Sequence, residues 1–233
     1  MPEFEAIVLA GGLGTRIRSV ASDRPKVMVD VGGRPFLEIL LDRMAQNGVA
    51  RTILATGHLH ELIKEHFGER RGTMAIRYCV EDRPLGTGGA VWKALKMTSR
   101  NDVFVFNGDT FFDVDLPRFY EFHRSMRADL TLALKPLRNF ERYGTVALDD
   151  GRITGFREKK KTAAGLINGG VYLLNRQGIE RFVFPEEFSL ETDFLEKMAD
   201  EITIAGFVHD GYFIDIGVPE DYARAQQELP RIS

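Results

Sequence analysis

The chain has little cysteine, no long apolar run and no strong excess of either charge. Its single cysteine, Cys79, cannot form a disulfide within the chain, so we interpret it as a small filler in a strand and expect a reducing compartment, the cytoplasm. No apolar stretch approaches the ~18 residues of a membrane span, and the N-terminus lacks a signal peptide's basic start and apolar core. The net charge of −3 gives no overall attraction to nucleic acid or to an acidic membrane, and we expect neither as a partner.

Two common phosphate-binding motifs are missing as well. No Gly-x-x-x-x-Gly-Lys-[Ser/Thr] string occurs, which excludes a P-loop NTPase. A Gly-x-Gly-x-x-Gly fingerprint starting at Gly12 fails because Ile17 occupies the place of its third glycine, which excludes a Rossmann dehydrogenase. No convincing nucleophilic Ser or Cys stands near a His, and we do not expect His58 and His60 to bind a metal.

The most informative feature that is present is a glycine-rich turn after the apolar run 6–9. Its glycines carry no Cβ, so the backbone can approach a ligand closely, and two cations, Arg16 and Lys26, follow. Exposed backbone N–H groups beside fixed positive charge suit a polyphosphate. We therefore predict a polyphosphate site made by the end of a strand, this turn and the Pro-Lys pair beyond it: Leu9, Gly11, Gly12, Gly14, Thr15, Arg16 and Lys26.

The pattern of apolar runs predicts one α/β domain. With 233 residues, of which 44% are hydrophobic, the chain can bury one large core. Strand-like and helical segments alternate, which predicts βαβ units and a mixed, mainly parallel sheet flanked by helices. The expected strands are 4–10, 51–56, 75–80 and 103–107, then 130–135, 143–148 and 171–174. Helices are expected from Pro35 to just before Gly48, at 59–67 and at 88–97.

The segment Gly11-Gly12-Leu13-Gly14-Thr15-Arg16, with Pro25-Lys26 beyond it, resembles the signature of the sugar-1-phosphate nucleotidyltransferases. The stretches 18–26 and 33–38 are similar to those of the heptose 1-phosphate guanylyltransferases of that family. This resemblance covers nearly the whole chain and implies a Rossmann-like three-layer α/β/α nucleotidyltransferase fold. Residues 1–233 would form one domain, with NTP on its N-terminal half and sugar phosphate on its C-terminal half. No hexapeptide repeat is present, so we expect no C-terminal β-helix domain.

The reaction that the resemblance implies is attack of a sugar 1-phosphate oxygen on the α-phosphorus of an NTP, with pyrophosphate leaving. Its nucleophile is already an oxyanion, so positioning and charge stabilisation replace a general base. Mg²⁺ is the expected cofactor, because it prefers carboxylate and phosphate oxygens. In the family, aspartates at the positions of Asp109 and Asp215 hold the metal, and each follows a strand-like run here. Arg16, Lys26 and Asp109 are the expected catalytic residues; a turn-capping Asp109 and a solvated Lys26 are the alternatives.

The segment Asp113-Val114-Asp115 offers a different function. An Asp-x-Asp after a strand is how metal-dependent glycosyltransferases hold a nucleotide-sugar diphosphate. However, Asp115 followed by Leu116 and Pro117 is also typical of a helix N-cap with proline in the first turn. We favour the N-cap and expect Asp113 to be a solvated turn residue.

The choice of base is predicted from the loop 81–89, which reads the base edge in the family. Uracil and thymine present acceptor–donor–acceptor edges that suit Gln, whereas guanine presents two neighbouring donors that suit a carboxylate. Glu81 therefore favours GTP, and Gly86 and Thr87 belong to the same nucleotide site. The alternatives are Asp82 in the place of Glu81, or a merely exposed acidic loop.

The resemblance places the sugar phosphate on residues of the second half of the chain. The matching motifs supply Tyr143 and Gly144, Glu158 and Lys159, Asn168 and Gly169, and Glu191. Glu158 would accept sugar hydroxyls and Lys159 would bind the phosphate, although the lysine run 159–161 also fits a solvated face. A helix-surface role is the alternative for Glu191.

The expected function is transfer of a guanylyl group from GTP to D-glycero-α-D-manno-heptose 1-phosphate, which forms GDP-heptose. Alternatives within the class are mannose or an amino sugar as the 1-phosphate, and UTP or dTTP as the donor. Outside the class stand the glycosyltransferase and an inactive nucleotide-sugar-binding module. The sequence predicts no oligomeric state.

Overall fold

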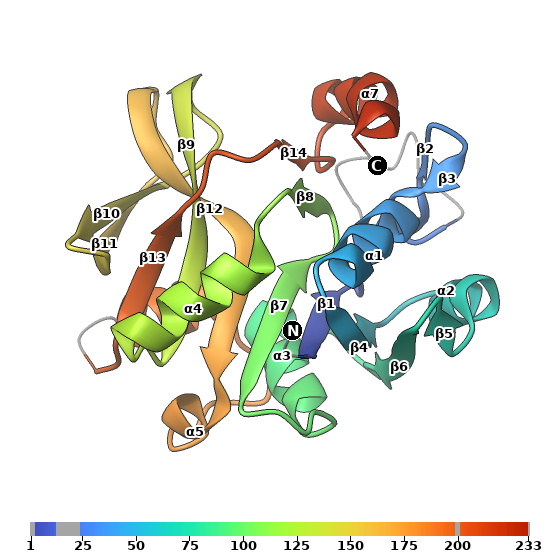
Figure 1. The fold of residues 1–233 in the computed structure, drawn as a ribbon, viewed down its shortest axis with the longest axis horizontal. Coiled ribbons are helices and arrows are strands. Elements are labelled where there is room, and N and C mark those ends of the chain that lie inside the picture. Colours follow the sequence, from blue (N-terminus) through green and yellow to red (C-terminus); the bar gives the residue numbers. More distant parts are fainter. Residues whose placement is uncertain (1–2, 13–23, 199–200, 233) are drawn as a thin grey trace.

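A ten-stranded mixed sheet forms the centre of the protein (Figure 1). The structure is a computed structural model, and it describes residues 3–12, 24–198 and 201–232. In spatial order the strands are β10 (Thr145–Asp149), β11 (Arg152–Arg157), β13 (Ile204–Val208), β9 (Leu130–Phe140), β12 (Thr162–Asn175), β7 (Asp102–Asn107), β1 (Phe4–Leu9), β4 (Val49–Thr56), β6 (Met74–Val80) and β5 (Arg70–Arg71). Two small sheets join β8 (Thr110–Phe112) to β14 (Phe213–Asp215), and β2 (Asp30–Val31) to β3 (Arg34–Pro35).

The two halves of the central sheet differ in strand direction. β7, β1, β4 and β6 are parallel neighbours, and Ile7 of β1 lies opposite both Ile53 and Val105. β12 pairs antiparallel with both β7 and β9, and among the remaining neighbours only β13 and β9 run parallel. The expected mixed sheet is confirmed. The expectation of mainly parallel strands holds for the N-terminal half, whereas most strand pairs of the C-terminal half are antiparallel.

Helices cover both faces of the sheet, which confirms the three-layer architecture (Figure 1). One buried cluster includes side chains of α1 (Phe36–Gln46), α2 (His60–Phe67), α4 (Leu116–Met126) and α7 (Pro219–Glu228). The other includes α3 (Gly86–Leu95), α5 (Arg176–Ile179), α6 (Glu196–Met198) and the π-helix η3 (Leu190–Leu195). Two 3-10 helices, η2 (Lys26–Met28) and η4 (Leu229–Arg231), complete the elements.

Strand β1 shows why this sequence forms a central strand. Phe4, Ala6 and Val8 lie in one buried cluster and Ile7 lies in the other, because successive side chains point to opposite faces. Both faces are covered, so Ala6 to Leu9 form a continuous apolar run, and the buried Glu5 before them is paired with Arg51. Its end at Leu9 places the glycine turn at the carboxyl edge of the sheet, where open α/β sheets bind ligands.

Several expected elements differ from the observed ones in extent. The expected strand 171–174 is the end of the fourteen-residue β12, whose register shifts between Asn168 and Tyr172. The sugar-binding turn expected at Asn168 is therefore an irregularity inside one strand. Helix α3 begins at Gly86, earlier than expected, while Cys79 is buried in β6 as expected. None of the described helices has the length and apolar character needed to cross a membrane.

Candidate active site

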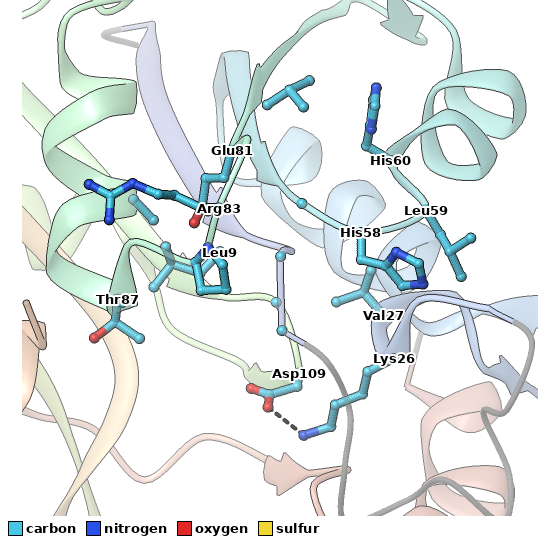
Figure 2. A pocket seen from close by; sticks show the side chains of 18 of the residues that line it. Leu9, Lys26, Val27, His58, Leu59, His60, Glu81, Arg83, Thr87 and Asp109 are labelled. Carbon is cyan, nitrogen blue, oxygen red and sulfur yellow. Dashed lines mark hydrogen bonds and ion pairs between the residues drawn. The ribbon is translucent and has the colours of Figure 1, made fainter. Parts of the chain in front are cut away.

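A cavity of about 1000 Å³ opens at the carboxyl edge of the parallel strands. Leu9, Gly11 and Gly12 of the first strand and its turn line it, together with Glu81 of the loop before α3 and Thr87 of the first turn of α3. Lys26 and Asp109 also line it, and Figure 2 shows this pair at a distance from Glu81, with His58 on the far wall. The structure thus brings together most of the residues expected at the nucleotide. The expected Gly14, Thr15 and Arg16 lie outside the described residues.

The two aspartates expected at the metal come together through the small sheet β8–β14. Thr110, next to Asp109, is the register partner of Asp215, and the Ile216 N–H donates to the Asp109 carbonyl at 3.0 Å. Lys26 Nζ donates to Asp109 Oδ2 at 2.5 Å, which joins the Pro-Lys segment to this point. Burial raises the pKa of Asp215, and the charge of Asp109 raises it further. The two carboxylates are therefore close enough to repel each other.

This pair of carboxylates fits a divalent cation that also binds a ligand's phosphates. Asp215 Oδ1 accepts the Gly217 N–H at 2.7 Å, which holds the carboxylate in one orientation. Among the described residues, no group of three or more His, Cys, Asp or Glu side chains could hold a metal ion. Mg²⁺ is typically bound by one or two carboxylates, several waters and substrate phosphates, so two aspartates suffice.

Glu81 occupies the part of the cavity next to the glycine turn. It is only partly exposed, and burial raises its pKa, against the lowering effects of the Leu85 N–H and Lys93. Glu81 Oε2 accepts the Leu85 N–H at 3.1 Å. Oε1 is on the side of Gly11, where an added Cβ would lie 3.1 Å from it. The carboxylate thus has one oxygen held by the backbone and one facing the place where a base would lie.

The glycines of the site have packing reasons that the sequence did not indicate. A Cβ on Gly108 would lie 2.4 Å from the Leu9 carbonyl oxygen, so Gly108 permits close contact with β1. Gly86 has φ +70°, and a Cβ there would lie 2.4 Å from the Phe188 carbonyl oxygen. A Cβ on Gly144 would lie 2.6 Å from the Arg157 carbonyl oxygen of β11, and one on Gly169 would lie 2.4 Å from the Phe112 ring.

A hydrogen-bond network joins several of the expected sugar residues. Tyr172 is fully buried, and its hydroxyl donates to Glu191 Oε1 at 3.2 Å and accepts from Asn168 Nδ2 at 2.9 Å. Thr87 Oγ1 donates to Glu191 Oε2 at 2.7 Å, which joins the first turn of α3 to the same carboxylate. Ser189 caps the π-helix that carries Glu191, as expected for a helix start. Glu191 is therefore held from three sides and is not a free surface residue.

The remaining expected sugar residues are less closely connected. Tyr143 packs edge-on against Phe213, the first residue of β14, at a ring distance of 5.9 Å. Glu158 and Lys159 follow β11 and are exposed, and neither lines the cavity. The structure does not bring these two to the Lys26–Asp109 pair.

The Asp-x-Asp segment is structural. Asp115 Oδ1 accepts the Arg118 N–H at 3.0 Å, and Asp115 is the N-cap of α4 as predicted. Asp113 is not a solvated turn residue, because its side chain accepts the Nε–H of Arg43 at 2.7 Å. Since both carboxylates are used within the fold, the glycosyltransferase hypothesis loses its metal-binding pair.

Other residues of the site were missed from the sequence. Asn107 ends β7 and lines the cavity, and its Oδ1 is buried without a hydrogen-bond partner among the described residues. His58 and Leu59 also line it, and Leu59 has φ +59°, an uncommon conformation for a non-glycine residue. The position of Asn107 at the end of a central strand was an available signal. Nothing local marked His58 and Leu59, because their place depends on how the 57–59 turn meets the sheet edge.

The fold and the cavity together define a three-layer α/β protein with a ligand-sized cavity at the carboxyl edge of its parallel strands. Residues 5–231 match the family described as Nucleotidyl transferase. The D-glycero-α-D-manno-heptose 1-phosphate guanylyltransferase of Aneurinibacillus thermoaerophilus is 49% identical, over 97% of this chain and 98% of that protein. The enzyme of the same name from Campylobacter jejuni is 42% identical, over 94% and 97%. The chain belongs to the sugar-1-phosphate nucleotidyltransferase family and is an enzyme of that family.

Solved structures agree with this assignment. The structure of HddC from Yersinia pseudotuberculosis complexed with GMP-PN has a TM-score of 0.86 and 36% identity, covering 97% of this chain and 99% of that one. A glucose-1-phosphate thymidylyltransferase from Bacillus anthracis, described as putative, has a TM-score of 0.83 at 21% identity, which shows the fold alone. Enzymes of this family generally use a divalent metal.

Proposed function

We propose that this enzyme transfers a guanylyl group from GTP to D-glycero-α-D-manno-heptose 1-phosphate, forming GDP-heptose and pyrophosphate. The observation that carries the proposal is the cavity itself, which has a carboxylate beside the glycine turn and, apart from it, a lysine paired with an aspartate (Figure 2). A guanine and its phosphates fit these two features in that order. The two relatives described as heptose 1-phosphate guanylyltransferases support the choice of both substrates.

The base would be recognised by Glu81 and the glycine turn. Glu81 Oε1 would accept the N1–H and 2-amino donors of guanine, while Oε2 stays on the Leu85 N–H. The backbone of Leu9 and Gly11 would complete the base pocket, and Gly86 and Thr87 would line its other side. Because the Leu85 N–H fixes one oxygen, the carboxylate needs no rearrangement to present the other.

In the reaction, a phosphate oxygen of the sugar 1-phosphate forms a bond to the α-phosphorus of GTP, and the bond from that phosphorus to the β-bridging oxygen breaks. Pyrophosphate takes the electron pair, and no proton has to be removed. Two unit charges about 4 Å apart repel by ~4 kcal/mol at an effective dielectric constant of about 20, so the site must supply cations. Lys26, which lines the cavity, would contact the phosphates, and Arg16 would contact the departing pyrophosphate.

Asp109 and Asp215 are the residues that would hold Mg²⁺. A bound Mg²⁺ would supply charge stabilisation for the phosphate oxygens. The protein's own part is to hold the two carboxylates together, through the β8–β14 pairing and the Gly217 N–H on Asp215. Tyr143, Gly144, Asn168, Gly169 and Glu191 would bind the sugar. Glu158 and Lys159, which follow β11 and lie outside the cavity, are still proposed as ligands of the sugar and its phosphate. The cytoplasm remains the proposed location.

Pyrophosphate release tests this function. The enzyme is mixed with Mg²⁺, each of GTP, UTP and dTTP, and heptose, mannose or amino-sugar 1-phosphates in turn. We expect turnover with GTP and the heptose 1-phosphate to exceed every other pair by at least tenfold. A preference for UTP or dTTP would overturn the base assignment, and a preference for mannose 1-phosphate would overturn the sugar.

Substitutions at the aspartates test the metal site against the glycosyltransferase alternative. Asp109→Ala and Asp215→Ala are each expected to lower kcat by at least 1000-fold, because both carboxylates hold the cation. Asp113→Ala is the matched control, since that side chain bonds to Arg43 away from the cavity. Loss of turnover in Asp113→Ala with retention in Asp215→Ala would refute this assignment.

A further inference from the structure

Arg142 is a cation beside the carboxylate pair that the site described above does not use. It lies in the loop between β9 and β10, directly before Tyr143. Its Nη2 is 3.7 Å from Asp215 Oδ2, and its guanidinium carbon lies 5.4 Å from the centre of the Tyr143 ring. Arg142 thus stands between a proposed metal ligand and a proposed sugar-binding residue.

The guanidinium is held in place from the side away from the carboxylate pair. Its Nη1 donates to Asp221, the third residue of α7, and the Asp221 side chain is 14% exposed. Asp221 is itself bonded by Arg224 at 3.1 Å, so its position does not depend on Arg142 alone. The orientation of Arg142 is therefore set before a ligand enters.

The other end of the guanidinium keeps free donor capacity. The 3.7 Å separation from Asp215 exceeds a hydrogen bond, and the 3.5 Å contact of Nη2 with the Tyr143 hydroxyl is at the limit of one. The Arg142 side chain is 39% exposed. A planar guanidinium with unused N–H groups is well suited to a phosphate, which it can bind through two oxygens.

The charges around the site require such a group. Lys26 lies at 2.5 Å from Asp109, so its charge is largely balanced by that carboxylate. A sugar 1-phosphate would bring further negative charge next to the Asp215 carboxylate, which lies 3.7 Å from Arg142 Nη2. The exposed Lys159 is not held beside these carboxylates by any contact among the described residues. Arg142 is a second basic side chain beside Asp215, in addition to Lys26, and Asp221 of α7 holds it there.

We infer that Arg142 binds the phosphate of the sugar 1-phosphate and holds it at the carboxylate pair. This inference rests on the proposed function, because it takes a sugar 1-phosphate as the second substrate. Asp221 acts through Arg142 as a positioning residue, so α7 contributes to the acceptor site although it lies outside the cavity.

Initial-rate kinetics of Arg142→Gln, with each substrate varied in turn, test the inference. We expect KM for the sugar 1-phosphate to rise at least tenfold while KM for GTP stays within twofold of the wild type. Arg142→Lys should recover part of the loss, since it keeps the charge but not the fork. Arg224→Gln is the matched control: it also loses a bond to Asp221, has no contact with Asp215, and should leave both KM values unchanged.

Two outcomes would overturn the inference. One is an Arg142→Gln enzyme with wild-type KM for the sugar 1-phosphate; the other is an equal rise in both KM values, which indicates a structural role. A second measurement separates phosphate binding from poor folding of the variant. Guanidinium ion added to Arg142→Ala should lower its KM for the sugar 1-phosphate. If the melting temperature of Arg142→Ala equals that of the wild type and guanidinium ion does not lower this KM, the result counts against phosphate binding. Failure of the wild type to release pyrophosphate with any sugar 1-phosphate would instead refute the proposed function.

Discussion

Replacing Glu81 by Gln is expected to change the base preference of the enzyme. The Leu85 N–H requires an acceptor at 3.1 Å, so the amide oxygen of the introduced glutamine would take the place of Oε2. The amide nitrogen would then take the place of Oε1, on the side of Gly11. A donor would face the two donors of guanine, whereas the same donor would meet an acceptor oxygen of uracil or thymine.

The magnitude follows from the hydrogen bond that is lost. A hydrogen bond to a charged group contributes about 1.5–3 kcal/mol, and each ~1.4 kcal/mol is a factor of ten. The Glu81→Gln variant should therefore lose roughly 10- to 150-fold in kcat/KM for GTP. Because the amide N–H of Gln would face the N–H donors of guanine, we expect the loss in kcat/KM for GTP to lie toward the upper end of this range. The kcat/KM for UTP should rise above its wild-type value.

The assay is pyrophosphate release with GTP and UTP at fixed sugar 1-phosphate. Asp82→Asn is the matched control: it is the same acid-to-amide change one residue further on, on a side chain that is 97% exposed. It should leave the ratio of the two kcat/KM values unchanged. The reasoning would be refuted if Glu81→Gln lowered both values by the same factor, or if Asp82→Asn changed the ratio as much.

Two further predictions concern buried polar groups. Burial lowers the pKa of His123 from 6.5 to about 4, a difference that corresponds to roughly 3 kcal/mol. The unfolded chain binds that proton first, so this stability is present above pH 6.5 and is lost as the pH falls toward 4. Urea unfolding should give a lower free energy of unfolding at pH 5 than at pH 7 for the wild type, and a smaller decrease for His123→Gln. Equal decreases in the wild type and in His123→Gln would contradict this prediction. Tyr172→Phe should raise KM for the sugar 1-phosphate about 2- to 12-fold, one hydrogen bond's contribution, by freeing Asn168 and Glu191. Tyr78→Phe loses a bond to the Gly68 carbonyl outside the site and should not change that KM.

Local sequence determined the elements of the N-terminal half. Residues 6–9 of β1 are apolar because both faces of the strand are buried, and α1 ends close to Gly48, which has φ +90°. The N-cap of α4 at Asp115 was predicted from short-range chemistry alone and is confirmed. These features depend on neighbours within a few residues, which a pattern can show.

Pairings between distant segments decided the rest. β12 is long because it pairs with β9 over most of its length. No local pattern in residues 162–170 predicts a strand. Gly108 is explained by the Leu9 carbonyl, and Asp113 by Arg43 of α1. Each of these contacts lies in a segment remote in sequence, so the sequence did not reveal the packing contact of Gly108, and the prediction of a solvated Asp113 was wrong.

The sequence by itself determined the chemical types at the site: a glycine turn, a lysine after proline, an acidic residue in the base loop and aspartates after two strands. Only the tertiary structure decided their arrangement. β14 pairs with β8 and brings Asp215 to Asp109, and α7 then holds Arg142 beside Asp215. Local propensity chooses elements from neighbouring residues, whereas a site is assembled by packing and strand pairing across the whole chain.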